Sequence, residues 1–122
     1  MKIRIRCGQI DKEAQLDDSS TAKTAYDNLP IKGSIHRWGD EIYFDVPFHI
    51  GLEVDAREVV FKGEIGFWPE GDCFCIFFGK TPMSEENEIR AASKVNVFGK
   101  IIGDSTVFKG ALEGQSILVE KI

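Results

Sequence analysis

Apolar and polar residues alternate at the start of the chain. The apolar members of this pattern are Ile3, Ile5, Cys7, Ala14 and Leu16. Because successive side chains of a strand point to opposite faces, a period of two predicts two strands that each bury one face. The pattern breaks near Gly8, so we expect an N-terminal hairpin that turns there.

Residues 19–29 instead have the period of a helix. Their apolar side chains recur three and four residues apart, at Ala22, Ala25, Tyr26 and Leu29. Ser19 and Ser20 offer side-chain oxygens that can cap the first turn, and Pro30 stops the pattern. We expect one short amphipathic helix in this segment.

Strand patterns dominate from Ile31 onward. They cover residues 31–38, 41–47, 59–68, 73–79, 94–102 and 115–121. Turn residues separate the first two of these strands and also the next two, which predicts two further hairpins. Closing a sheet of many short strands removes its exposed edges, so we expect a closed all-β barrel of about eight strands with one short α-helix. Residues 80–93 lack a clear period and predict a long loop, either a functional element or a floppy insertion.

Pairing the first of these hairpins about Gly39-Asp40 assigns each side chain to a face. The face that we expect to be core carries Ile35, Ile42, Phe44 and Val46. The opposite face carries His36, Trp38, Glu41 and Tyr43, where a plain solvent face would carry Lys, Glu and Thr. Arg37 has the parity of the core set and should lie beside the turn, at the mouth of the barrel. Glu41 would have a raised pKa if it were covered, and would otherwise be a solvated cross-strand partner.

The next hairpin pairs residues 65–68 with residues 73–76. One face is consistently apolar and consists of Ile65, Phe67, Phe74 and Ile76. On the other face Gly66 leaves a hollow in front of Cys75, bordered by Trp68 and Phe77. This arrangement predicts a shallow groove with an aromatic rim. Alternatively, Trp68 and Phe77 pack beneath the helix.

Composition narrows the class of protein. The chain has 122 residues, 43% of them hydrophobic, and a net charge of -5, which suits a single folded domain over residues 1–122. It has no cluster of Lys and Arg, so we do not expect nucleic acid to be a partner. The longest apolar run, residues 73–78, is far shorter than the roughly 20 residues that span a bilayer, and the N-terminus lacks the pattern of a signal peptide. Three cysteines cannot form a closed disulfide framework, so we expect a cytoplasmic protein without a membrane partner.

The glycines and the histidines suggest no cofactor. His36 and His49 lack the short paired spacings of a zinc site, even with Cys73 and Cys75 nearby in the sequence. The glycines suit turns and strands rather than a phosphate-binding loop. We therefore expect neither a metal nor another cofactor, and the sequence indicates no oligomeric state.

Several motifs resemble a known family. The segment GDCFCIFFGKT at residues 71–81, followed by VFGKI at residues 97–101, resembles the cyclophilins, and KGSIHR at residues 32–37 is similar to the segment that carries their catalytic arginine. More closely, the motifs WGDEIYF, REVV, GFWP and FFGKTP, which begin at residues 38, 57, 66 and 77, resemble a family of minimal prokaryotic cyclophilin-like proteins. This resemblance covers most of residues 1–103 and implies the cyclophilin barrel.

The resemblance also implies roles for individual positions. Arg37 falls at the catalytic arginine, and Ile42 and Tyr43 fall near the pair that lines the proline pocket. If Lys80-Thr81 is aligned with the cyclophilin Lys-Thr turn, the pocket phenylalanine corresponds to Cys75; a shift of two residues makes it Phe77 instead. Asp45, Met83 and Val95 stand where the cyclophilins have glutamine, tryptophan and histidine. Several pocket positions therefore differ from those of the cyclophilins.

Two functions from different classes remain open. The first is a weak or atypical peptidyl-prolyl isomerase in which Arg37 donates a hydrogen bond to the imide nitrogen of a proline-containing peptide. One charged hydrogen bond of roughly 1.5–3 kcal/mol would accelerate the reaction only about 10- to 150-fold. Alternatively, Arg37 is structural, and stacks on Trp38 or pairs with Glu41 or Asp45.

The second function is a binding module without catalysis. It would hold a small molecule or an extended peptide in an aromatic-lined groove under residues 80–93, because binding sites are usually concave and apolar with few polar groups. The candidate binding residues are Trp38, Glu41, Tyr43, Trp68, Phe77, Phe78, Thr81 and Met83.

Overall fold

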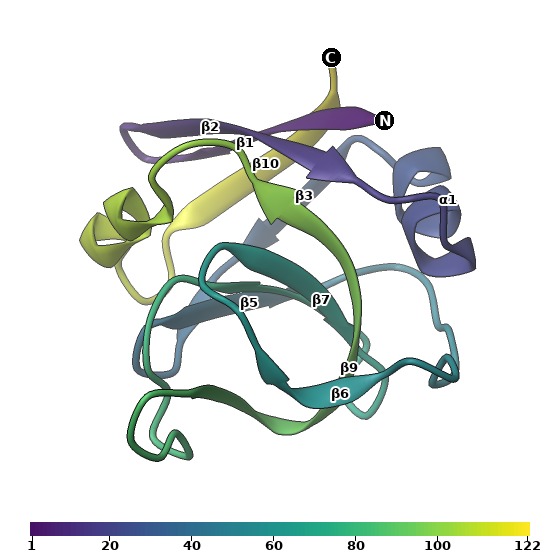
Figure 1. The fold of residues 1–122 in the computed structure, drawn as a ribbon. Helices are drawn as coiled ribbons and strands as arrows, with labels where there is room; N and C mark the ends of the chain where they lie inside the picture. Colours follow the sequence, from purple (N-terminus) through teal and green to yellow (C-terminus); the bar gives the residue numbers. More distant parts are fainter.

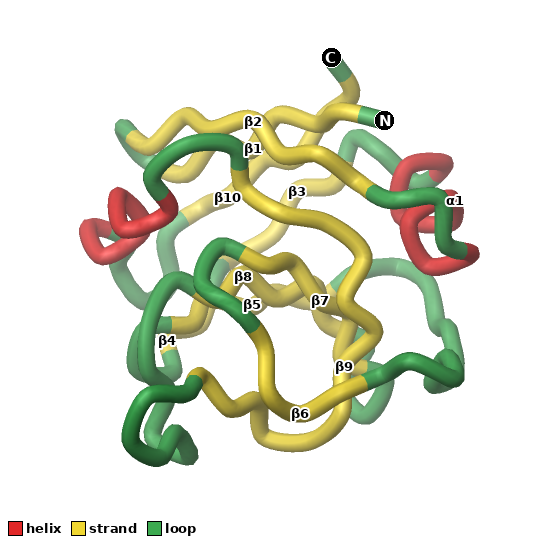
Figure 2. Tube along the Cα trace, viewed as in Figure 1, coloured by secondary structure: helices red, strands yellow, loops and turns green.

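Ten strands and two short helical segments make up the chain in the computed structural model, which describes all of residues 1–122 (Figure 1). The strands are β1 (Lys2–Cys7), β2 (Ile10–Leu16), β3 (Ile31–Ser34), β4 (His36–Arg37), β5 (Glu41–Asp45), β6 (Arg57–Val60), β7 (Glu64–Trp68), β8 (Cys73–Phe77), β9 (Ile89–Ile101) and β10 (Ser116–Lys121). The helical segments are the α-helix α1 (Ser20–Asp27) and the 3-10 helix η1 (Ser105–Gly110). Figure 2 shows them on opposite sides of the strands. Neither has the length and apolarity that a membrane crossing requires.

The mainly β prediction with one short α-helix is confirmed, and so are its local details. Ile3, Ile5 and Cys7 are buried in the N-terminal hairpin of β1 and β2. The Ser19 side chain accepts a hydrogen bond from the backbone N–H of Ala22 at 3.1 Å, which caps α1 as expected.

The prediction of a closed barrel is wrong. The strands wrap around a common interior (Figure 1), but their hydrogen-bonded order runs from β3 through β10, β1, β2, β9, β7, β8 and β5 to β4, and these two end strands do not pair with each other. The reason is that one chain segment changes partner at Ile35. Before this residue the segment pairs with β10 as β3, and after it the segment pairs with β5 as β4. The Ile35 N–H donates to the Gln115 carbonyl at 2.9 Å, and the Ile35 carbonyl accepts from the Gly114 N–H at 2.8 Å.

Two strand boundaries also differ from the prediction. The expected strand at residues 59–68 is two strands, β6 and β7, separated by a turn in which Gly63 has a φ of 89°. β9 begins at Ile89, so the irregular segment is shorter than the expected loop over residues 80–93. β9 is also unusually well connected: it pairs with β6, β7 and β2.

Hydrophobic side chains form two separate clusters. The larger one, the main core, contains 23 buried residues, including Ile35, Ile42, Phe44 and Val46 as expected. The smaller one consists of Val60, Cys73, Cys75, Phe77, Ala91 and Val95, with Tyr43, Trp68, Ile89 and Val97 packed against it. Strands β5, β7 and β8 lie between the two clusters, which explains why every residue of β8 is buried.

Candidate functional site

A cavity of about 230 Å³ lies beside the smaller cluster, and we call it the aromatic pocket. Its lining consists of Trp38, Glu41, Tyr43, Trp68, Cys75, Ala91, Ala92 and Val95. Four of the sequence-predicted binding residues therefore meet in one cavity: Trp38, Glu41 and Tyr43 come from the β4–β5 hairpin and Trp68 from β7. Seven of the eight lining residues are hydrophobic, and Glu41 is the charged one.

Strand register places these side chains on one face. Both predicted hairpin registers are confirmed: His36 is opposite Tyr43 across β4 and β5, and Gly66 is opposite Cys75 across β7 and β8. Tyr43 is in turn opposite Cys75 across β5 and β8. Because side chains alternate along a strand, Glu41, Tyr43 and Cys75 all face away from the main core.

Gly66 sets one boundary of the pocket. A Cβ atom at this position would lie 3.0 Å from Cγ2 and 3.2 Å from Cβ of Val95, which is closer than side chains normally approach. The missing side chain thus lets β9 come near β7, and the ladder between them shifts register between Ile65 and Gly66. The hollow expected at Gly66 is filled by Val95, and the open space lies beside it.

Trp68 is held by a hydrogen bond at its polar edge. Its indole N–H donates to the Ser93 hydroxyl at 2.6 Å, and that hydroxyl donates to a carboxylate oxygen of Glu70. The ring therefore packs against β9. The alternative that Trp68 and Phe77 lie beneath α1 is wrong, because both belong to the cluster formed with β6 and β9.

Glu41 is a buried carboxyl group in an apolar wall. Its exposed fraction is only 6%, and no Lys, Arg or His lines the pocket. Burial raises the pKa of Glu41 from its ordinary value of 4.5 to about 7, against the smaller opposing effect of a hydrogen bond with the Cys75 thiol. At neutral pH this group can therefore hold a proton or give it up at little cost.

The Cys75 thiol, which lies beside Glu41, is not a nucleophile. Burial is the main cause that raises the pKa of the Cys75 thiol well above its ordinary value, with the nearby charge of Glu41 as the next cause. The thiol consequently stays protonated and acts as a weak hydrogen-bond donor. The structure gathers no cluster of three His, Cys, Asp or Glu side chains that could hold a metal ion.

Comparison with known proteins identifies the family. The model of the cyclophilin-like family matches residues 1–120. The chain belongs to the cyclophilin-like family. A solved structure of the same shape is the solution structure of a hypothetical protein from Archaeoglobus fulgidus, with 39% sequence identity and a TM-score of 0.85 over 100% of this chain and 95% of the other. A search of curated proteins gave no match.

Arg37 of this cyclophilin-like protein lies away from the aromatic pocket. Its guanidinium carbon is 5.2 Å from the centre of the Phe78 ring, on the side of the main core. Its other partners are the carbonyl oxygens of Gly39 (3.0 Å), Lys109 (3.1 Å) and Ala111 (2.7 Å) and a carboxylate oxygen of Asp40 (3.3 Å). These contacts tie the turn after β4 to η1. A structural role was one of the alternatives, but the partners are Phe78 and Asp40, whereas we expected Trp38, Glu41 or Asp45. A catalytic role for Arg37 stays a prediction.

The remaining predicted binding residues lie outside the pocket of this cyclophilin-like fold. Phe77 is fully buried in the smaller cluster, and Phe78 is fully buried in the main core, where its ring is 6.0 Å from that of Phe108. Met83 is half exposed on the segment between β8 and β9. Thr81 is buried within the same segment.

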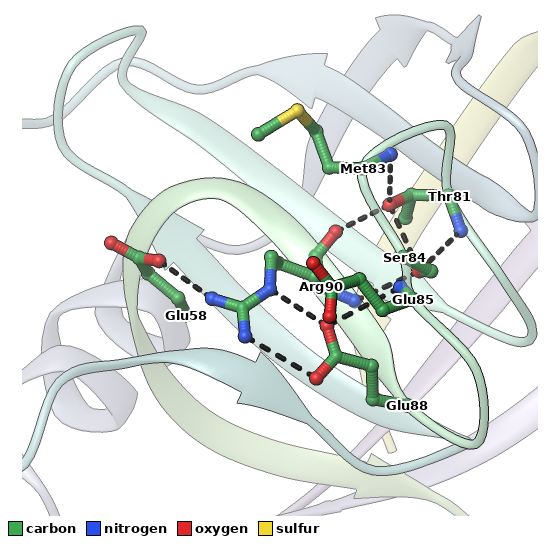
Figure 3. Close-up of polar contacts among 7 residues, drawn as sticks. All are labelled: Glu58, Thr81, Met83, Ser84, Glu85, Glu88 and Arg90. Atoms are coloured by element: carbon green, nitrogen blue, oxygen red, sulfur yellow. Dashed lines mark hydrogen bonds and ion pairs between the residues drawn. The ribbon is translucent and has the colours of Figure 1, made fainter.

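Hydrogen bonds and ion pairs of its side chains hold the segment between β8 and β9 in place (Figure 3). The Ser84 hydroxyl accepts hydrogen bonds from the backbone N–H groups of Thr81 (2.9 Å) and Arg90 (3.0 Å), and the Thr81 hydroxyl donates to the Arg90 carbonyl. The Arg90 guanidinium binds Glu88 at 2.7 Å and Glu58 at 2.9 Å, and its hydrogen bond holds the pKa of Glu88 below the ordinary value. This segment is therefore a braced connection, and the pocket wall next to it is the start of β9.

Sequence reasoning missed the wall that β9 contributes. Ala91 and Ala92 lie in the segment 80–93 that the sequence predicts as a loop, and alanine has no functional group that would mark a site. Two neighbouring small residues do, however, leave space when they face large aromatic side chains. Their position before a clear strand pattern was the one signal that could have pointed to this wall.

Proposed function

We propose that this cyclophilin-like protein is a binding module that holds a small, mostly apolar ligand in the aromatic pocket. The observation that carries the proposal is Glu41, a carboxyl group with 6% exposure and no cationic partner among the residues around it. Burying a carboxyl group among apolar side chains without a cationic partner costs stability, and carboxyl groups perturbed in this way cluster at functional sites. The surrounding aromatic walls supply the apolar contact that small ligands need.

The size of the cavity supports a small ligand. Pockets for drug-sized molecules are about 300–1,000 Å³, and the aromatic pocket measures about 230 Å³. A molecule of a few carbon atoms fits this space. A peptide could place one side chain in it, such as a proline ring, but the extended chain would have to lie outside.

Arg37 favours binding over catalysis. An isomerase needs a donor aimed at the imide nitrogen of a proline held in an apolar slot. The guanidinium of Arg37 already donates to three backbone carbonyls and to Asp40, on the opposite face from Trp38 and Tyr43. The aromatic pocket and this arginine therefore do not form one site, and we propose binding without isomerisation.

Tryptophan fluorescence provides a direct test, because the only two tryptophans, Trp38 and Trp68, both line the pocket. The probes are benzyl alcohol, cyclohexanol, 3,3-dimethylbutan-1-ol, choline and N-acetylprolinamide, each titrated to millimolar concentration. We expect at least one of them to change the emission and to shift backbone amide resonances of β5, β8 and the start of β9.

A variant that obstructs the pocket completes this test. Ala92 is exposed at the rim, so Ala92→Phe should weaken binding at least about tenfold without unfolding the protein. Val54→Phe adds the same ring at an exposed position elsewhere and should leave binding unchanged. The proposal fails if no probe perturbs the pocket resonances, or if Ala92→Phe binds every probe as well as the wild type does.

A further inference from the structure

The aromatic pocket has the composition of a cage for a cation. We infer that its ligand carries an alkylated ammonium group, such as a trimethylammonium, which sits among Trp38, Tyr43 and Trp68 and is neutralised by the Glu41 carboxylate. This inference rests on the proposed binding function and names the chemical class of its ligand.

The aromatic side chains supply the first part of the argument. The negative faces of Trp and Tyr rings attract cations, and clusters of such rings are what proteins use to bind quaternary ammonium groups. Here Trp38 and Tyr43 of the β4–β5 hairpin meet Trp68 of β7 in one cavity. The indole N–H of Trp68 already donates to Ser93, so this group needs no hydrogen-bond acceptor from a ligand.

Charge supplies the second part. Glu41 is on β5. The titratable groups that interact electrostatically with it are Tyr43, Cys73 and Cys75, all of which are neutral or acidic. β7 and β9 add only Trp68, Ala91, Ala92 and Val95 to the lining. An anionic ligand would therefore meet like charge. A neutral ligand would leave Glu41 in the protonated form that burial favours, whereas a cation would take the place of that proton and pair with the carboxylate.

Hydrogen-bonding capacity indicates that the ammonium is alkylated. A primary ammonium has three N–H donors and a guanidinium has five, but the pocket offers one carboxylate among seven hydrophobic residues. Donors without acceptors in a buried site cost affinity. A trimethylammonium has no N–H donor, so it can use the charge of Glu41 and the ring faces at once.

Choline and 3,3-dimethylbutan-1-ol test the inference, because they have the same shape and differ in the central atom, which is N⁺ in the first and carbon in the second. Both are titrated into the wild-type protein with calorimetry and tryptophan fluorescence. We expect choline to bind at least about tenfold more tightly than the neutral alcohol. In Glu41→Gln this preference should disappear while the alcohol still binds, and Glu41→Asp should retain part of it.

A methylation series provides a second measurement on the wild-type protein. Affinity should rise from methylammonium to tetramethylammonium if ring faces bind the cation, and fall along the series if hydrogen bonds do. Equal binding of choline and the alcohol, or a preference for the alcohol, would overturn the cation inference and leave the binding module intact. The cation inference also fails, and the binding module stands, if choline does not bind while another probe binds and Ala92→Phe weakens that binding. If no probe binds, the proposed function fails as well.

Discussion

The two faces of strands β5, β7 and β8 differ in what covers them. On one face the main core contains 23 buried residues, including many Ile side chains and Phe rings that pack against one another. On the other face the small residues Cys75, Ala91 and Ala92 leave room beside three aromatic rings, and Glu41 is buried there. One face of these strands thus packs into the main core and the other borders a cavity, the site of the proposed binding function, so mutations on the two faces should have different effects.

Removing a ring from the main core should have the largest effect on stability. Phe74 is buried, stacks on Phe44 with ring centroids 5.0 Å apart and meets the edge of Phe98 at 5.4 Å. Phe74→Ala should lower the free energy of unfolding by about 3–5 kcal/mol in urea titrations. Tyr43→Ala, on the pocket face, should cost less than half as much, because that ring borders an existing cavity. Equal losses would mean that both faces contribute alike to stability.

Glu41 should make the folded protein less stable as pH rises. The unfolded chain ionises this group near its ordinary pKa of 4.5 and the folded protein near 7. Between these values the folded state holds more protons, so the free energy of unfolding falls with increasing pH, by about 3 kcal/mol in total. Glu41→Gln should abolish that fall and be more stable than the wild type at pH 8.

The exposed Glu86 provides the matched control for this pH dependence. Glu86→Gln removes the same charge at the surface and should leave the pH profile of urea unfolding as it is in the wild type. If Glu41→Gln also leaves the profile unchanged, the carboxyl group at position 41 is not desolvated in the folded protein.

Arg37 should matter for stability and not for proline isomerisation. Arg37→Ala removes charged hydrogen bonds to the Lys109 and Ala111 carbonyls of the η1 region, which should cost about 1.5–3 kcal/mol in urea unfolding. The wild-type protein should isomerise a proline peptide at the uncatalysed rate. A faster wild-type rate that Arg37→Ala abolishes, while the variant remains folded, would restore the isomerase hypothesis.

The smallest effect is expected at the boundary of the pocket. Gly66→Ala places a Cβ atom 3.0 Å from Val95 Cγ2, so it should cost about 1 kcal/mol and narrow the cavity. Gly51→Ala is its control, because a Cβ there has no neighbour within 4 Å. We expect weaker binding of the pocket probes in Gly66→Ala than in Gly51→Ala. Identical titrations would show that Val95 moves aside without affecting the pocket.

Local patterns predicted most of the sheet. Turn residues such as Gly39 and Asp40 fix which residues of a hairpin face each other, and alternation then separates Trp38, Glu41 and Tyr43 from the core set. The same reasoning cannot detect a turn inside an apolar run, and the Val60-Phe61 pair concealed the break between β6 and β7.

Contacts between distant segments could not be predicted in this way. The partners of β9 are set by tertiary packing, because its long strand pairs with β6, β7 and β2 in succession. The wall formed by Ala91 and Ala92 follows from that packing and leaves no trace in the alternation. Open and closed sheets also have the same alternating patterns, because alternation shows where strands lie but not whether the two edge strands pair with each other.

Ile35 has a topological consequence for the sheet. In a barrel closed by hydrogen bonds, the shear between first and last strands is fixed by a ladder that can in principle slip by whole residues. In this protein the end strands β3 and β4 are successive parts of one segment, joined through Ile35. The ring of strands around the core is therefore completed at Ile35 by covalent bonds. Sliding of one strand past another cannot change the offset between β3 and β4.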